Sequence, residues 1–294
     1  MPPMRVALAL GSGGARGYAH IGVIRALEER GYEITSIAGT SMGAVVGGLH
    51  AAGRLDAYTE WVSGLSQRQV LRLLDPSITS PGVIRAQKIL AMVADLLGGA
   101  LIEELPVRFT AVATDLFARK EVWFQRGPVE AAIRASMALP SVITPVVLHG
   151  RVLVDGGLLN PIPIAATSGS HADLTIAVSL SEEHHVLGGG SPIHESGDPA
   201  DIADGSDHPT EERIEDTVYG TLPAGLRTLD VMRLSLDAIQ SLVTRYRLAG
   251  YPPDVLVTIP KASCGTLDFH RATEMIALGR ERALEALDRA SSPS

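Results

Sequence analysis

One pentapeptide constrains this chain more than any other stretch: residues 39–43 read G-T-S-M-G, a G-x-S-x-G motif. The apolar residues Ile34, Ile37 and Ala38 precede it and small residues at 44–48 follow, which predicts a strand, a sharp turn and a helix. Ser41 would stand at the turn with its hydroxyl pointing out of the sheet. Gly39 and Gly43 would let the strand and the helix approach closely. Because the motif also occurs by chance, the rest of the chain has to decide whether the serine is functional.

The composition fits one large α/β domain or two small ones. The chain has 294 residues, of which 46% are hydrophobic, and a mean hydropathy of +0.19. These values allow a sizeable core and exclude global disorder. The single cysteine, Cys264, excludes an intrachain disulfide and agrees with a reducing compartment, so we expect a cytoplasmic protein. No uncharged apolar run approaches the ~18–20 residues that a transmembrane helix needs.

The acidic residues are concentrated in one segment. Eleven of the 33 acidic residues but only one of the 25 basic ones lie between Ser181 and Asp216, so the remainder, with 22 acids and 24 bases, is nearly neutral. Residues 182–216 are therefore expected to form an acidic, flexible loop. Its histidines follow no usual metal-ligand spacing, and we expect no metal site there. These histidines are His184, His185, His194 and His208. The lack of a basic patch argues against nucleic acid as a partner.

The hydrophobic periodicity predicts alternating strands and helices. Strands are expected at 5–10, 32–38, 107–114, 120–124, 146–148, 151–154, 174–180 and 254–260. Helices are expected at 18–30, 42–52, 55–65, 67–74, 85–97, 128–137, 222–248 and 269–287. The first part of the chain thus reads strand, helix, strand, helix, which implies parallel strands with right-handed crossovers.

A second glycine-rich turn, G-S-G-G-A-R-G at residues 11–17, follows the first strand. Because parallel strands end at the same edge of a sheet, this turn and the Ser41 turn should lie side by side. Gly13 and Gly14 would expose backbone N–H groups, and the N–H of Met42 would point the same way. Several N–H donors around one serine hydroxyl form the arrangement that a developing oxyanion needs.

The serine also needs a base, and no histidine stands where a hydrolase would need one. His20 lies inside the first predicted helix and is expected to be structural, and the other histidines outside the acidic loop are poorly placed. Among them are His50 within a helix, His149 in a hairpin turn and His171 in a loop. Asp155 fits better, because it ends a predicted strand and is followed by Gly156 and Gly157. Taken alone, D-G-G is more often an ordinary turn.

Together, the glycine-rich loop, the serine pentapeptide and the later D-G-G resemble the patatin-like phospholipase family. Further matches lie at 19–23 (A-H-I-G-V), 134–140 (R-A-S-M-A-L-P), 156–163 (G-G-L-L-N-P-I-P) and the last helix around Gly279. The resemblance covers residues 6 to about 287 except the acidic loop. It is strongest to compact bacterial members similar to the catalytic domain of neuropathy-target-esterase-like enzymes.

The resemblance implies an α/β fold of three layers, α/β/α, with a mainly parallel central sheet. It implies a single patatin-like Ser–Asp hydrolase domain over residues 1–294. Within this domain we expect a helical insert or cap at 55–102 and the acidic flexible loop at 182–216. No cofactor and no metal are implied.

By the same resemblance, Ser41 is the nucleophile and Asp155 the base of a catalytic dyad without histidine. The implied oxyanion hole comprises Ser12, Gly13, Gly14 and Met42, with Arg16 and Gly17 supporting the loop. Gly39, Gly43 and Gly156 are the motif glycines. The loop departs from the family at Ser12, where glycine is common, since a serine keeps the N–H but restricts the backbone.

The implied activity is that of a serine lipid acyl hydrolase, of phospholipase A or lysophospholipase type, that works through an acyl-enzyme. The apolar helices at 55–74 and 89–102 would bind acyl chains or rest on the inner face of the membrane. Open alternatives are a transacylase or thioesterase with the same dyad, and a non-catalytic lipid-binding regulatory member. A dinucleotide site is disfavoured, because the second strand ends in Gly39-Thr40-Ser41 and not in an acid. Head group, chain length and oligomeric state stay open.

Overall fold

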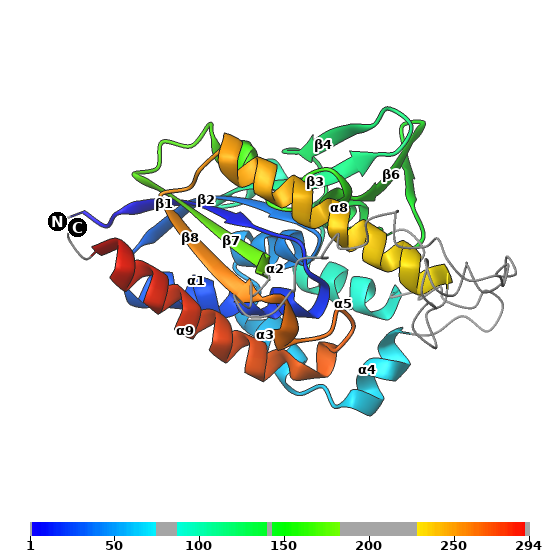
Figure 1. Cartoon of the computed structure of the whole chain (residues 1–294), viewed down its shortest axis with the longest axis horizontal. Coiled ribbons are helices and arrows are strands. Elements are labelled where there is room, and N and C mark those ends of the chain that lie inside the picture. The colour runs from blue at the N-terminus through cyan, green and yellow to red at the C-terminus, as the bar shows by residue number, and fades with distance from the viewer. Residues whose placement is uncertain (1, 75–86, 140–142, 183–227, 292–294) are drawn as a thin grey trace, which may run out of the picture. The chain divides into compact units, whose positions relative to one another are not determined.

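The computed structural model describes residues 2–74, 87–139, 143–182 and 228–291. Those up to 182 and from 238 onward belong to one compact unit. Its central sheet has eight strands in the order β5-β6-β3-β2-β1-β7-β8, with β4 also paired to β3 (Figure 1). The strands are β1 Arg5–Leu10, β2 Glu33–Thr40, β3 Arg108–Asp115, β4 Lys120–Phe124, β5 Val146–Leu148, β6 Arg151–Asp155, β7 Leu174–Glu182 and β8 Val255–Pro260.

The helices of the described residues agree with the predicted ones. They are α1 Ala19–Glu29, α2 Met42–Ala51, α3 Leu55–Ser63, α4 Gln67–Leu74, α5 Gln87–Leu97, α6 Val129–Ser136, α8 Thr228–Gly250 and α9 Ala272–Ser291. Most ends of helices and strands lie within about two residues of the prediction, the margin by which such ends fray. The last helix starts later than expected, because residues 269–271 form a separate 3₁₀ turn. Residues 222–227 and 183–216, parts of two predicted elements, lie outside the described residues.

The sheet is mainly parallel, as predicted. Strands β3, β2, β1, β7 and β8 are parallel neighbours, while β4, β5 and β6 run antiparallel to their partners. Parallel strands are buried on both faces and therefore consist of nearly continuous apolar residues, as the run 6–10 shows.

Alternate residues of the central strands serve two different cores. Leu8 and Leu10 of β1 face the core that contains α1, α2 and α9, whereas Ala9 belongs to a second cluster with Ile162, against which Leu248 of α8 packs. Figure 1 shows α1 and α9 on one side of the sheet and α8 on the other. The layers are therefore helix, sheet, helix, and the predicted fold class is confirmed.

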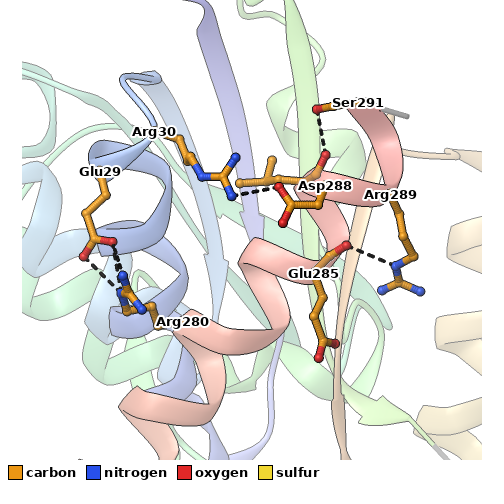
Figure 2. Close-up of polar contacts among 8 residues, drawn as sticks. Glu29, Arg30, Arg280, Glu285, Asp288, Arg289 and Ser291 are labelled. Carbon is orange, nitrogen blue, oxygen red and sulfur yellow. Dashed lines mark hydrogen bonds and ion pairs between the residues drawn. The ribbon is translucent and has the colours of Figure 1, made fainter. Parts of the chain in front are cut away.

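Helices α1 and α9 pack with little separation because each carries a glycine at the crossing. A Cβ atom on Gly22 would overlap the carbonyl oxygen of Ile276, and one on Gly279 would overlap that of Ala19. Ion pairs line the exposed rim of this contact (Figure 2), with Glu29 bound to Arg280 and Arg30 bound to Asp288 at 2.7 Å each. Since these pairs are largely exposed, the close apolar packing and not the charges holds the helices together.

No helix of the described residues is long and apolar enough to cross a membrane. The expected insert at 55–102 contains α3, α4 and α5, with residues 75–86 outside the description. That residues 1–294 form a single domain stays a prediction.

We predict that Gly279→Ala lowers the free energy of unfolding by about 1–3 kcal/mol, because the helices must separate to admit the methyl group. Urea denaturation would measure the change. Gly169→Ala is the matched control, because a Cβ atom there meets nothing within 4 Å. Equal stability of the two variants would contradict the close contact.

Candidate active site

Ser41 occupies the turn between β2 and α2 in a backbone conformation that few non-glycine residues adopt, with φ 57° and ψ −123°. Such strain persists only where the surroundings enforce it. Here a Cβ atom on Gly39 would overlap the carbonyl of Gly43, and one on Gly43 would overlap that of Leu10. The two glycines thus allow the close approach that forces the bend, as the motif predicted.

A neighbouring serine holds the strained turn in place. The backbone N–H of Ser41 donates to Oγ of Ser136 at 2.9 Å, and that hydroxyl donates to the carbonyl of Val112 at 2.6 Å. Ser136 is fully buried at the end of α6. The sequence offered one signal for this residue, its place in the R-A-S-M-A-L-P match, but no indication of its contact with Ser41.

The side chains of Ser41 and Asp155 are in direct contact. The Ser41 hydroxyl donates to Oδ2 of Asp155 at 2.6 Å, while Oδ1 accepts the N–H of Gly157 at 2.7 Å. Asp155 is buried, and burial raises its pKa from 3.8 to about 6, against the opposing effect of its two hydrogen bonds. The carboxylate is therefore more basic than an exposed aspartate and is ionised at neutral pH.

Strand β3 brings these two residues together. The pairing of β3 with β2 ends at Val112, which lies opposite Thr40. The pairing of β3 with β6 begins at the next residue, Ala113, which lies opposite Asp155. The end of β2 and the end of β6 therefore meet at adjacent positions of one strand. Gly156 makes this possible, because a Cβ atom there would overlap the carbonyl of Val112.

The glycine-rich loop supplies N–H groups beside the serine. Among the described residues, no hydrogen-bond acceptor is found for the N–H of Gly13 or Gly14. Met42 is the first residue of α2, so no helix carbonyl can accept its N–H. Gly14 and Met42 line the same pocket as Ser41, while Gly13 is not one of its lining residues.

Ser12 departs from the expected set of donors. Its N–H donates to the carbonyl of Pro161 at 2.8 Å and is thereby occupied. The reason is the position of the D-G-G segment, which brings Pro161 against the loop. The N–H of Ser12 is therefore not free to stabilise an oxyanion.

Two further loop residues make contacts that fit a supporting role. Nη1 of the buried Arg16 donates to the carbonyls of Lys261 at 3.0 Å and Cys264 at 3.4 Å, tying the loop to the segment after β8. A Cβ atom on Gly17 would overlap the side chain of Met42, so this glycine lets the loop lie against the start of α2.

A buried network fixes the segment that follows Asp155. The N–H of Asn160 donates to the carbonyl of Gly156 at 2.8 Å, and the Asn160 carbonyl accepts the Thr40 hydroxyl at 2.9 Å. Its side-chain amide donates to Glu121 at 2.8 Å, and Glu121 is ion-paired with Arg247 of α8. Asn160 thus links the residues next to Ser41 and Asp155, which the sequence did not reveal.

No histidine of the described residues is hydrogen-bonded to the Ser41 hydroxyl, which contacts Asp155 instead. The fully buried His20 uses Nε2 to contact the carbonyl of Gly11 at 2.8 Å, and burial lowers its pKa to about 4. It is neutral and structural, in agreement with its predicted role. His50 lies 3.9 Å from Glu28, and His149 occupies the β5–β6 turn. Within the described part of the chain, no three His, Cys, Asp or Glu side chains gather as a metal site would require.

An apolar pocket of about 650 Å³, including its open mouth, adjoins the serine. Besides Ser41 and Asp155, its described lining is almost entirely hydrophobic or aromatic. These lining residues are Tyr18, Val45, Tyr58, Ile89, Met137, Leu139, Ile143, Leu267 and Phe269. Tyr58 of α3 and Ile89 of α5 come from the expected insert, and the rest come mainly from around the glycine-rich loop, the start of α2, α6 and the segment before α9. The pocket can accept a hydrocarbon chain but offers little to a polar one.

The chain is similar to several known proteins. A family model described as patatin-like phospholipase matches residues 8–167. An uncharacterized NTE family protein of Mycobacterium tuberculosis is 47% identical over 97% of this chain and 91% of its own length. The lysophospholipase NTE1 of Coccidioides immitis is 29% identical over 97% of this chain and 18% of its own length. Among solved structures, VipD from Legionella pneumophila is similar with a TM-score of 0.45 at 13% identity, covering 99% of this chain and 67% of VipD.

The raised pKa of Asp155 predicts a specific pH dependence of stability. Because this pKa is about 6 in the folded protein but 3.8 ordinarily, the folded state binds more protons between these values and loses stability as the pH rises through them. In Asp155→Asn the side chain at this position cannot ionise, so the variant does not lose stability in this way. Relative to the wild type, the variant should therefore gain up to about 3 kcal/mol between about pH 4 and about pH 7.5.

Urea denaturation of both proteins across this pH range would measure the difference. Asp173→Asn is the control, because Asp173 is exposed and its pKa is lowered by Arg5, so this variant should lose stability relative to the wild type as the pH rises. A constant difference between the Asp155 variant and the wild type would contradict the raised pKa.

Proposed function

Because the chain belongs to the patatin-like phospholipase family, we propose that it is a serine lipid acyl hydrolase that uses a Ser41–Asp155 dyad. The observation that carries the proposal is the 2.6 Å hydrogen bond between the two side chains beside an apolar pocket. Family membership alone supports lipid hydrolysis in general. The dyad and the substrate class are our proposals.

In the first step, ionised Asp155 accepts the proton of Ser41 as Oγ attacks the carbonyl carbon of an ester. The oxyanion that forms receives hydrogen bonds from the N–H groups of Gly14 and Met42, with Gly13 as a third donor. When the tetrahedral intermediate collapses, the bond to the alcohol oxygen breaks and Asp155 returns the proton to the leaving alcohol. An acyl-enzyme on Ser41 remains.

In the second step, Asp155 accepts a proton from water as the water oxygen attacks the acyl carbonyl. When this second tetrahedral intermediate collapses, the bond to Oγ of Ser41 breaks, Asp155 returns the proton to Oγ, and a fatty acid leaves. An aspartate is a weak base for an alcohol, so the reaction depends on two features that raise its effectiveness. Burial brings its pKa to about 6, nearer to neutral pH. The helix α2 and the glycine-rich loop stabilise the negative charge as it moves from the carboxylate to the oxyanion.

The pocket favours an acyl chain as the group that lies next to Ser41. Its hydrophobic lining would take a fatty acyl chain from water, which contributes roughly 0.8 kcal/mol for each buried methylene. A phospholipid or lysophospholipid supplies such an ester. We further propose a cytoplasmic location, because a chain with Cys264 as its single cysteine fits a reducing compartment.

A transacylase or thioesterase remains the alternative within the same chemistry. The dyad would form the same acyl-enzyme, and only the attacking or leaving group would differ. Mass spectrometry of the products with a phospholipid and added acceptor alcohols separates the two. A free fatty acid as the main product supports hydrolysis, whereas acyl transfer to the alcohol supports the transacylase.

We predict that Ser41→Ala and Asp155→Asn each lower kcat for a short nitrophenyl ester by about 10³-fold or more, because each removes a partner of one proton transfer. The controls His50→Gln, His149→Gln and His171→Gln should retain kcat, since none of these side chains contacts the Ser41 hydroxyl. Loss of activity in one of the histidine variants, with the fold retained by circular dichroism, would argue for a histidine base. Equal rates for the wild type and Ser41→Ala would exclude the serine mechanism.

The dyad also predicts how the rate depends on pH. Since Asp155 acts as a base, kcat/KM should fall on the acid side with a midpoint near about 6, the pKa of the buried carboxyl. Stopped-flow hydrolysis of the same ester measures this profile. A midpoint near the ordinary aspartate value of about 4 would contradict the role given to burial.

A further inference from the structure

Two adjoining turns expose large hydrophobic side chains on one edge of the sheet. Leu116 and Phe117 lie between β3 and β4 and are 42% and 78% exposed, and Val147 of β5 is 72% exposed. Large apolar side chains grouped on the surface usually mark a contact with a partner or a membrane. We call the surface formed by residues 116–120 and 147–151 the β-tip.

Backbone contacts hold the β-tip together. The N–H of Leu116 donates to the carbonyl of Val152 at 2.9 Å, and Val152 is paired with Val147 in the β5–β6 ladder. The N–H of Ala118 donates to Oδ1 of Asp115 at 3.0 Å, which fixes the turn that presents Phe117. The apolar residues of the two turns therefore form one preformed surface.

The β-tip is basic, although the protein as a whole carries a net charge of −8. Arg119, Lys120 and Arg151 are exposed there. Two acids of the adjoining strands β3 and β4 are both paired, Asp115 with Arg151 itself and Glu121 with residues outside the β-tip. Asp115 is buried and lies 3.8 Å from Nε of Arg151, and Glu121 is bound to Arg247 and Asn160. A surface with projecting apolar side chains and surrounding cations complements an anionic lipid bilayer.

We propose that the β-tip docks this protein on an anionic membrane, with Phe117 and Val147 entering the acyl region and Arg119 and Lys120 meeting lipid phosphates. The inference rests on the proposed function, in which the bilayer supplies the substrate. Strand β6 runs from Arg151 at the β-tip to Asp155 at the site, a span of four residues or roughly 13 Å. Docking there would hold the dyad close to the lipid surface.

The helices at 55–74 and 89–102, for which the sequence leaves open a lipid-facing role, expose fewer large hydrophobic side chains than the β-tip. In their described residues, Leu71 is the one large hydrophobic side chain that is mainly exposed. Because it stands alone on α4, it serves as a matched control for Phe117.

The test is co-sedimentation of the full chain with vesicles of phosphatidylcholine, with and without phosphatidylglycerol. We expect the wild type to bind the anionic vesicles more tightly, and added salt to weaken this binding. Phe117→Asp should lower the binding constant by about tenfold or more, because it places a charge where the bilayer would bury a ring. Arg119→Gln combined with Lys120→Gln should remove the preference for anionic lipid. Leu71→Asp should bind as the wild type does.

Hydrolysis of the soluble nitrophenyl ester serves as the second readout. Neither Phe117 nor the cations line the pocket, so these variants should keep the activity of the wild type on the soluble ester and lose activity on vesicles. If the wild type hydrolyses no ester, the proposed function fails, while the binding data still decide the docking surface. Unchanged vesicle binding in Phe117→Asp, or a loss in Leu71→Asp alone, would overturn the proposal. The proposal would also be overturned if the wild type formed a dimer that binds no vesicles and Phe117→Asp separated it into monomers. The β-tip would then be the contact with a second copy of the chain.

Discussion

The hydrogen bond between Ser41 and Asp155 is the contact on which the site depends, and β3 makes it possible. Strand β3 pairs with the end of β2 and then with the end of β6. Residues more than a hundred positions apart therefore lie opposite adjacent residues of one strand. The antiparallel entry of β6 is essential here. A strand that left the sheet in the parallel direction would carry its last residue away from the serine.

Two unfavourable features are concentrated at this contact. Ser41 has a strained backbone, and Asp155 is a carboxylate buried away from water. Both persist because surrounding groups enforce them: Ser136 holds the turn, and Asn160 with Glu121 and Arg247 holds the segment after Asp155. The rest of the sheet is well packed and provides the stability that tolerates them. The strained residue and the buried carboxylate therefore adjoin each other, as expected for the proposed site, in which a weak base would act on an alcohol.

The sequence was most informative where local chemistry decides the structure. Periodicity located the strands and helices, because a buried parallel strand needs a continuous apolar run and a helix an apolar stripe. The glycines of the two turns were informative for the same reason, since the structure shows that a Cβ atom at Gly39, Gly43 or Gly156 would overlap backbone. Ser12 was misjudged as a free donor, because its N–H is occupied by Pro161, a residue far along the chain. Ser136 and Asn160 also act on residues far along the chain, and apart from their places in the R-A-S-M-A-L-P and G-G-L-L-N-P-I-P matches nothing indicated these contacts.

The sequence by itself determined the α/β class, the turn at Ser41 and the candidates for its chemistry, because these follow from residue types at short spacing. Only the tertiary structure decided that Asp155 meets the serine hydroxyl, that its pKa is raised by burial, and that Gly14 and Met42 line the same pocket. It also decided which apolar side chains remain outside, since the exposure of Phe117 depends on how two hairpin turns lie against each other. The physical reason is common to all of these. Burial and strand pairing depend on partners distant in the chain, and the identity of those partners is settled only when the sheet is assembled.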